Sequence, residues 1–172
     1  MTTIGFHGGH SIYGLGTVSD VILFFNFMVT YVVQSRSEQD WSLLTDRLYR
    51  RYLRQEELAR AAELMSEVRF VFSTLPSSSV TWKDCILKDN VETKLNLQMP
   101  TLADIFAKYF ENFSRACASA ISFVDCFKIY QPVKIVIIDQ PWFLMETQRP
   151  LNEYDELKDN PFWWNNSQYY LK

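Results

Sequence analysis

Apolar side chains surround the segment Val18–Val33 almost completely, which restricts where this segment can lie in a folded chain. Its sixteen residues are many for a strand. The preceding sequence Thr17-Val18-Ser19-Asp20 has capping-box spacing, in which the hydroxyl and the carboxylate each accept a hydrogen bond from a backbone N–H. The pattern therefore predicts a helix. Because a helix that is apolar on all sides must be buried, we expect it at the centre of the fold.

All five glycines of the chain stand within the first sixteen residues, at Gly5, Gly8, Gly9, Gly14 and Gly16. They alternate with apolar residues, and this pattern predicts a short β-hairpin. A second strand signal is the β-branched run at 133–138, which lies between two prolines. It predicts a buried strand that pairs with the hairpin in a small sheet.

Apolar residues at helical spacing predict further helices. One spans Ser37–Leu53 and the next spans Arg54–Leu75. A long amphipathic helix begins at Leu102, after the capping-box sequence Thr101-Leu102-Ala103-Asp104, and ends before Pro132.

Between these helices we expect a loop at Pro76–Ser79 and a short strand at Val80–Leu87. Together the elements predict an α+β fold, with three to four helices packed on the sheet that the hairpin and the 133–138 strand form. The length predicts one domain over residues 1–172.

Neither export nor membrane insertion is indicated. The longest uncharged apolar stretch, Val21–Val33, is shorter than the ~20 residues needed to cross a bilayer. Met1–Gly16 has no basic region, which argues against a secretory signal. The cysteines Cys85, Cys117 and Cys126 form an odd set without CxxC spacing, and we expect the last two on a buried helix. These features predict a cytoplasmic protein.

Motifs for catalysis or cofactor binding are incomplete in the sequence. Gly9–Thr17 has Leu15 where a phosphate-binding loop requires lysine. His7 and His10 are the only histidines, and they have no third ligand at a metal-binding spacing. No nucleophile motif of the GxSxG type occurs, although a distant pair such as Cys117 with His7 stays open. We expect no metal, no cofactor and no enzyme activity.

The segment 139–172 differs in character from the rest of the chain. Its six acidic and three basic residues give a balance of −3, which equals the formal net charge of the whole chain. Acidic side chains attract a basic partner, and aromatic rings supply contact area at the centre of an interface. The contact residues that we expect are Trp142, Glu153, Tyr154, Asp155, Glu156, Asp159, Trp163 and Trp164. A solvated acidic loop is the alternative interpretation.

Several short segments occur in an order that is typical of one protein family. They are Ser11–Gly16 leading to Phe24-Phe25; Leu43, Leu44, Leu48 and Tyr49; Gln55-Glu56-Glu57; Leu75-Pro76-Ser77 with Val80 and Trp82; and Thr101-Leu102 with Tyr109-Phe110. In this pattern, which covers residues 4–138, the chain resembles the bacterial polymorphic-toxin immunity proteins of the immunity protein 70 family.

The resemblance implies a protein that is encoded beside a toxin of a contact-dependent growth-inhibition system and that binds and neutralises the toxin domain in sibling cells. The acidic segment suits a basic nuclease as partner, with an RNase as first expectation, and the formal net charge of −3 for the whole chain argues against direct nucleic-acid binding. We expect a monomer or weak dimer. An adaptor or subunit-type interaction protein is the alternative, followed by a small hydrolase built around His7, His10 and a distant acid.

Overall fold

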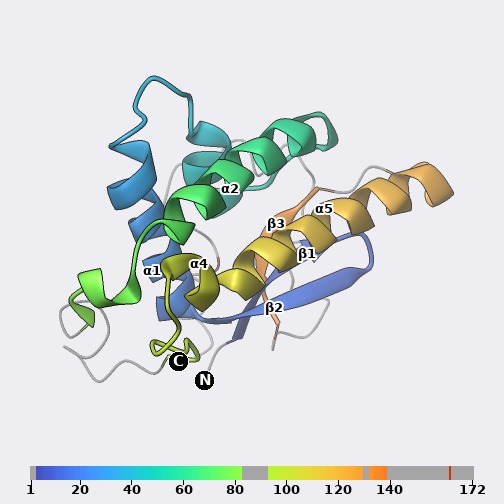
Figure 1. The fold of residues 1–172 in the computed structure, drawn as a ribbon. Helices are drawn as coiled ribbons and strands as arrows, with labels where there is room; N and C mark the ends of the chain where they lie inside the picture. Colours follow the sequence, from blue (N-terminus) through green and yellow to red (C-terminus); the bar gives the residue numbers. More distant parts are fainter. Residues whose placement is uncertain (1–2, 83–92, 130–131, 139–162, 164–172) are drawn as a thin grey trace.

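The computed structural model describes residues 3–82, 93–129, 132–138 and 163. A three-stranded sheet packs against the long helix α5 (Ala107–Phe127), and helix α2 (Leu58–Ser73) runs beside α5 (Figure 1). Helix α1 (Val18–Met28) follows the hairpin and lies near the start of α5. The predicted α+β fold is confirmed.

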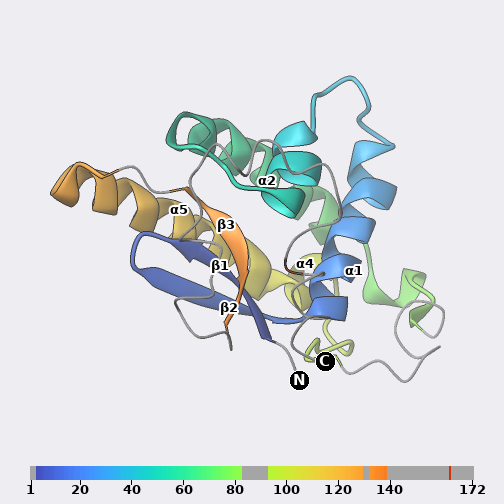
Figure 2. The same ribbon diagram turned by 180° about the vertical axis from the view of Figure 1, so that it is seen from behind.

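The sheet contains the three predicted strands. Strands β1 (Thr3–Gly8) and β2 (Ser11–Thr17) form the hairpin, and β3 (Lys134–Ile137) pairs with the other edge of β1. Both pairs are antiparallel, and His7 stands opposite Lys134. Figure 2, which shows the molecule from behind relative to Figure 1, has β3 in front, beside β1. All residues of β3 are buried, as its β-branched sequence predicts.

The tip of the hairpin packs its backbone directly on α5. A Cβ atom on Gly8 would lie 2.1 Å from the backbone oxygen of Ala116. Gly9 has a φ of 61°, and a Cβ atom there would lie 2.6 Å from the backbone oxygen of Ser119. Only glycine allows both the positive φ and the close approach, so these two residues set the distance between hairpin and helix.

Helix α1 begins as predicted, with a complete capping box. The Thr17 hydroxyl accepts a hydrogen bond from the Asp20 N–H at 3.1 Å, and the Asp20 carboxylate accepts one from the Thr17 N–H at 3.3 Å. The same carboxylate accepts hydrogen bonds from the Thr93 hydroxyl at 2.5 Å and the Lys94 N–H at 2.9 Å. After Met28 the helix continues as the π-helix η1 (Val29–Val33), a wider turn than the regular helix we expected to residue 33.

The helix predicted for Ser37–Leu53 is shorter in the structure. Its main part is the π-helix η2 (Leu43–Leu48), whereas Leu53 lies outside any helix. The Leu53 N–H donates to the Val133 carbonyl at 2.8 Å, and the Val133 N–H donates to the Leu53 carbonyl at 3.0 Å. The backbone N–H and C=O of Leu53 are thus bonded to Val133, and its side chain is buried. Because these groups are not available for helical hydrogen bonds, the helix ends before Leu53.

The two later helices are confirmed but divided. The segment predicted at 54–75 forms the 3-10 helix η3 (Gln55–Glu57) followed by α2. The helix predicted from Leu102 forms α4 (Leu102–Ile105) and α5, with a break at Phe106, where ψ is 18°. Phe106 is fully buried against the ring of Phe24, with centroids 5.3 Å apart. Because of these divisions, the helical segments exceed the three to four that we predicted.

The connection between α2 and α4 differs in part from the prediction. Ser77–Ser79 form a 3-10 turn, η4, within the expected loop, and Pro76 makes a β-bridge with Thr101. Of the strand predicted at Val80–Leu87, residues 80–82 are not in a strand, and 83–87 lie outside the described residues.

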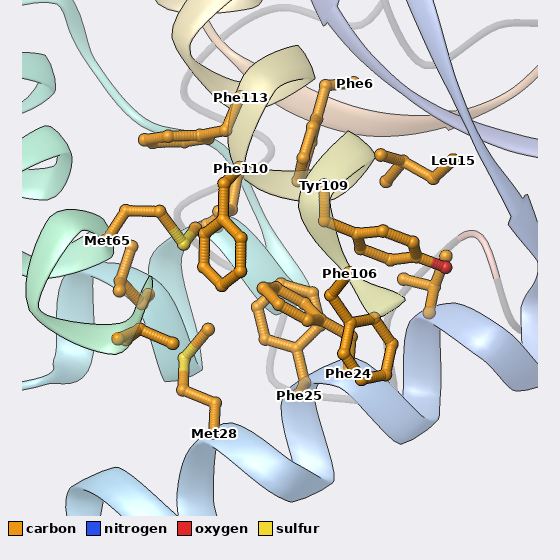
Figure 3. Close-up of a cluster of buried hydrophobic side chains, with 14 of the residues drawn as sticks. Phe6, Leu15, Phe24, Phe25, Met28, Met65, Phe106, Tyr109, Phe110 and Phe113 are labelled. Carbon is orange, nitrogen blue, oxygen red and sulfur yellow. The ribbon is translucent and has the colours of Figure 1, made fainter. Parts of the chain in front are cut away.

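Aromatic rings fill the space between α1, α2 and the start of α5. Phe24 is at the centre of this cluster, and Figure 3 shows its ring near Phe25, Phe106 and Tyr109. Edge-to-face and tilted ring pairs of this kind are each worth about 0.5–1.5 kcal/mol beyond the area they bury. The helix that we predicted at the centre of the fold therefore lies there, and its rings hold the helices together.

Candidate functional site

Of the eight expected contact residues, the structure describes one. Trp163 is fully buried, and its indole N–H donates a hydrogen bond to the Tyr49 carbonyl at 3.0 Å. This placement differs from the surface position that we expected, because a buried ring with its polar atom bonded inside the protein does not reach a partner. The other seven, from Trp142 to Trp164, lie outside the described residues.

The two histidines lie near the hairpin tip. His10 is exposed and stacks edge-on against Phe123, with centroids 4.4 Å apart. Burial, with a further contribution from the charge of Lys134, lowers the pKa of His7 to about 4. Within the described residues no group of three or more His, Cys, Asp or Glu side chains is placed to hold a metal ion.

The two described cysteines, Cys117 and Cys126, differ in their exposure to solvent. Cys117 is buried, and this burial raises the pKa of its thiol to about 12, so the nucleophilic thiolate is disfavoured there. Cys126 is exposed, contrary to the expectation that both cysteines of this helix are buried, because it lies near the end of α5. Cys85 lies outside the described residues.

An open groove runs between α2 and the α4–α5 segment, and we call it the α2–α5 groove. Its larger hollow has a volume of about 580 Å³. A smaller hollow of about 40 Å³ continues it along α5. The residues that line the larger hollow are Ser66, Arg69, Phe70, Ser73, Thr101, Ala103, Asp104 and Ala107. Ser66 and Arg69 line both hollows, so the two form one surface feature.

Small residues and the packing of the helices create this groove. Ala103 and Ala107 leave space on one wall, and serines leave space on the other. Beneath the groove, Met65 and Phe110 are buried between α2 and α5, which holds the two walls at a set distance. Figure 3 shows these two side chains facing each other from the two helices.

Arg69 is the cation of the α2–α5 groove. Its guanidinium lies over the ring of Phe110, 5.7 Å from the centroid. Among the described residues, no carboxylate lies within ion-pair distance of Arg69. The carboxylate that lines the groove, Asp104, instead accepts hydrogen bonds from the Thr101 N–H at 3.2 Å and the Thr101 hydroxyl at 2.8 Å.

Phe70 is the exposed ring of the same groove. It is 63% exposed, the highest value among the large hydrophobic side chains that the structure describes. A second exposed ring, Phe127, is 57% exposed at the far end of α5, beside His10 and Phe123. Phe70 lines the α2–α5 groove together with the cation Arg69, and we therefore take this groove as the candidate binding site.

The sequence contained one signal for this groove. The apolar stripe of α2 includes Leu58, Met65 and Phe72, and Phe70 falls outside it. A large ring on the polar side of an amphipathic helix is consistent with an interaction surface, although single exposed apolar side chains also occur on ordinary surfaces. Arg69 carried no such signal, because arginine is ordinary on a solvated helix face.

Comparisons with known proteins returned no match to a family model, to a curated protein or to a solved structure. In the part of the chain that the structure describes, no helix has the length and apolar character required to cross a membrane.

Proposed function

We propose that this protein is an immunity protein, which binds and neutralises one cognate toxin domain in the cytoplasm. The observation that carries the proposal is the α2–α5 groove, where the exposed ring of Phe70 lies beside the guanidinium of Arg69, which has no ion-pair partner in the described part of the chain. Arginine is enriched among the residues that contribute most to protein–protein binding, and Phe is enriched at the cores of interfaces. The segment order that resembles the immunity protein 70 family supports the choice of a toxin as partner.

The charge of the chain supports a basic partner. The acidic balance of residues 139–172 would accelerate association with a basic nuclease, and an RNase is our first choice. Cys117 and Cys126 are free thiols, as a protein that acts in a reducing compartment requires. An adaptor in a cellular complex would use the same kind of surface and is the alternative.

The experiment that tests this function is co-purification from the native operon. The chain is tagged, washed at moderate salt, and its bound partners are identified by mass spectrometry. We expect a toxin domain encoded beside it, and we expect co-expression of this chain to rescue the growth of cells that produce that domain. A bound domain whose toxicity is unaffected by the chain, or a bound housekeeping complex, would overturn the immunity function.

A further inference from the structure

The guanidinium of Arg69 is exposed on α2 and lacks an ion-pair partner among the described residues. It lies over the Phe110 ring, 5.7 Å from the centroid, and both hollows of the α2–α5 groove open beside it. Asp104, the carboxylate that lines the same groove, accepts hydrogen bonds from Thr101 and lies beyond ion-pair distance of Arg69. The planar fork of a guanidinium is pre-organised, so less rotamer freedom is lost for each hydrogen bond that it makes to an anion.

The chemistry of a planar guanidinium favours a carboxylate. Its parallel N–H groups match the two oxygens of a carboxylate in a bidentate pair, which is stronger and more directional than a single hydrogen bond. The neighbouring hydroxyl of Ser66 and the small side chain of Ala107 leave room for a backbone to approach. The acceptor we look for is therefore a carboxylate on a polypeptide.

Phe70 adds an apolar contact at the same place. A ring that is 63% exposed gains free energy when an apolar side chain covers it, by roughly 25 cal/mol for each Å² of apolar surface removed from water. The groove is an open channel rather than an enclosed cavity, and serines, a threonine and alanines form much of its walls. Small-molecule sites are more enclosed and more apolar, so an extended segment of a protein fits better.

From this arrangement we infer that the α2–α5 groove binds an acidic segment of the partner protein, with a carboxylate of the segment on Arg69 and an apolar side chain on Phe70. The inference rests on the proposed function only in requiring a protein partner. It adds a second contact surface with the opposite charge preference to that of the acidic segment 139–172.

A phage-displayed library of random twelve-residue peptides tests the inference without the natural partner. The full chain is the bait, and each selected peptide is then measured against variants by fluorescence anisotropy. The groove variants are Arg69→Gln, Arg69→Lys and Phe70→Ser. The matched controls are Arg60→Gln, a charge change elsewhere on α2, and Phe127→Ser, a change of the other exposed ring. Circular dichroism establishes that each variant is folded.

We expect selected peptides to combine an acidic with an apolar residue. Their affinity should fall about tenfold or more with Arg69→Gln or Phe70→Ser, fall less with Arg69→Lys, and stay unchanged with both controls. The inference would be overturned by any of three results: the selected peptides lack acidic residues, their affinity is the same for the groove variants as for the unchanged protein, or Phe127→Ser lowers the affinity as much as the groove variants do. A toxin could still be recovered and neutralised in that case, so this result is independent of the co-purification.

Discussion

Trp163 contacts Tyr49 through both a hydrogen bond and a ring contact. Its indole N–H donates to the Tyr49 carbonyl at 3.0 Å, and the two rings pack edge to face with centroids 5.6 Å apart. Tyr49 in turn stacks on Phe25 of the central helix at 4.7 Å. A residue of the acidic, aromatic segment thereby joins the core that the earlier helices build.

Substituting Trp163 tests this attachment. Trp163→Ala should lower the free energy of unfolding by about 3–5 kcal/mol, because it removes a large buried side chain and leaves a cavity. Trp163→Phe should cost less, since it keeps an aromatic ring and loses mainly the hydrogen bond to Tyr49, worth about 1–3 kcal/mol when a buried carbonyl is left unpaired. Urea unfolding measures both values. A loss below ~1 kcal/mol for Trp163→Ala would contradict a core position.

The close approach of the hairpin to α5 predicts a sharp contrast between two glycines. Gly8→Ala should destabilise the protein by about 2 kcal/mol or more, because its Cβ would collide with backbone atoms of Ala116, which cannot move aside independently. Gly14→Ala should be nearly neutral, since the nearest atom to its Cβ is the Ile138 Cδ1 at 3.6 Å. Urea midpoints of the two variants should differ clearly, and equal midpoints would argue against the packing.

Stability should depend on pH through His7. The folded-state pKa of about 4 lies below the ordinary value of 6.5, so the unfolded chain binds more protons between these values. The free energy of unfolding should therefore be highest above pH 6.5, where His7 is neutral in both states. It should fall as the pH decreases toward 4 and then stay constant with respect to this group, with a total loss of at most about 3 kcal/mol. His7→Gln should remove this fall, whereas the matched change His10→Gln should retain it. Thermal unfolding across this pH range gives the comparison.

A buried hydroxyl offers a substitution that should stabilise the protein. The Tyr109 hydroxyl is buried and makes no hydrogen bond with the described residues, and burial, followed by the nearby Asp20 charge, raises the pKa of this group well above its usual value. Tyr109→Phe should therefore raise the free energy of unfolding by up to ~1 kcal/mol, since it removes an unsatisfied polar atom and keeps the ring. Tyr13→Phe, at a half-buried ring, should change little. A clear loss with Tyr109→Phe would indicate a partner for the hydroxyl.

Local sequence signals were sufficient for much of the fold. The capping boxes at Thr17 and Thr101 each depend on residues within one turn, and both form with their reciprocal hydrogen bonds. The hairpin and the 133–138 strand were also predictable, because glycine spacing and β-branched runs report backbone preference directly.

Long-range contacts explain what the sequence did not reveal. Leu53 has the pattern of a helical residue, and only its pairing with Val133 takes it out of the helix. Phe106 lies in an uninterrupted apolar pattern, and its burial against Phe24 accompanies the break between α4 and α5. The candidate groove was likewise hidden, because it depends on how α2 and α5 pack and not on a motif in either helix.

The order of strands in the sheet has a consequence for synthesis of the protein. Strand β2 follows β1 directly in the chain and can pair with it early in synthesis. The other edge of β1 pairs with β3, which is synthesised only after α5. Until then this edge presents unpaired backbone groups, and such edges recruit other strands. The nascent chain therefore presents a free edge of its central strand while the helices are synthesised, and this edge is paired only when β3 has been made.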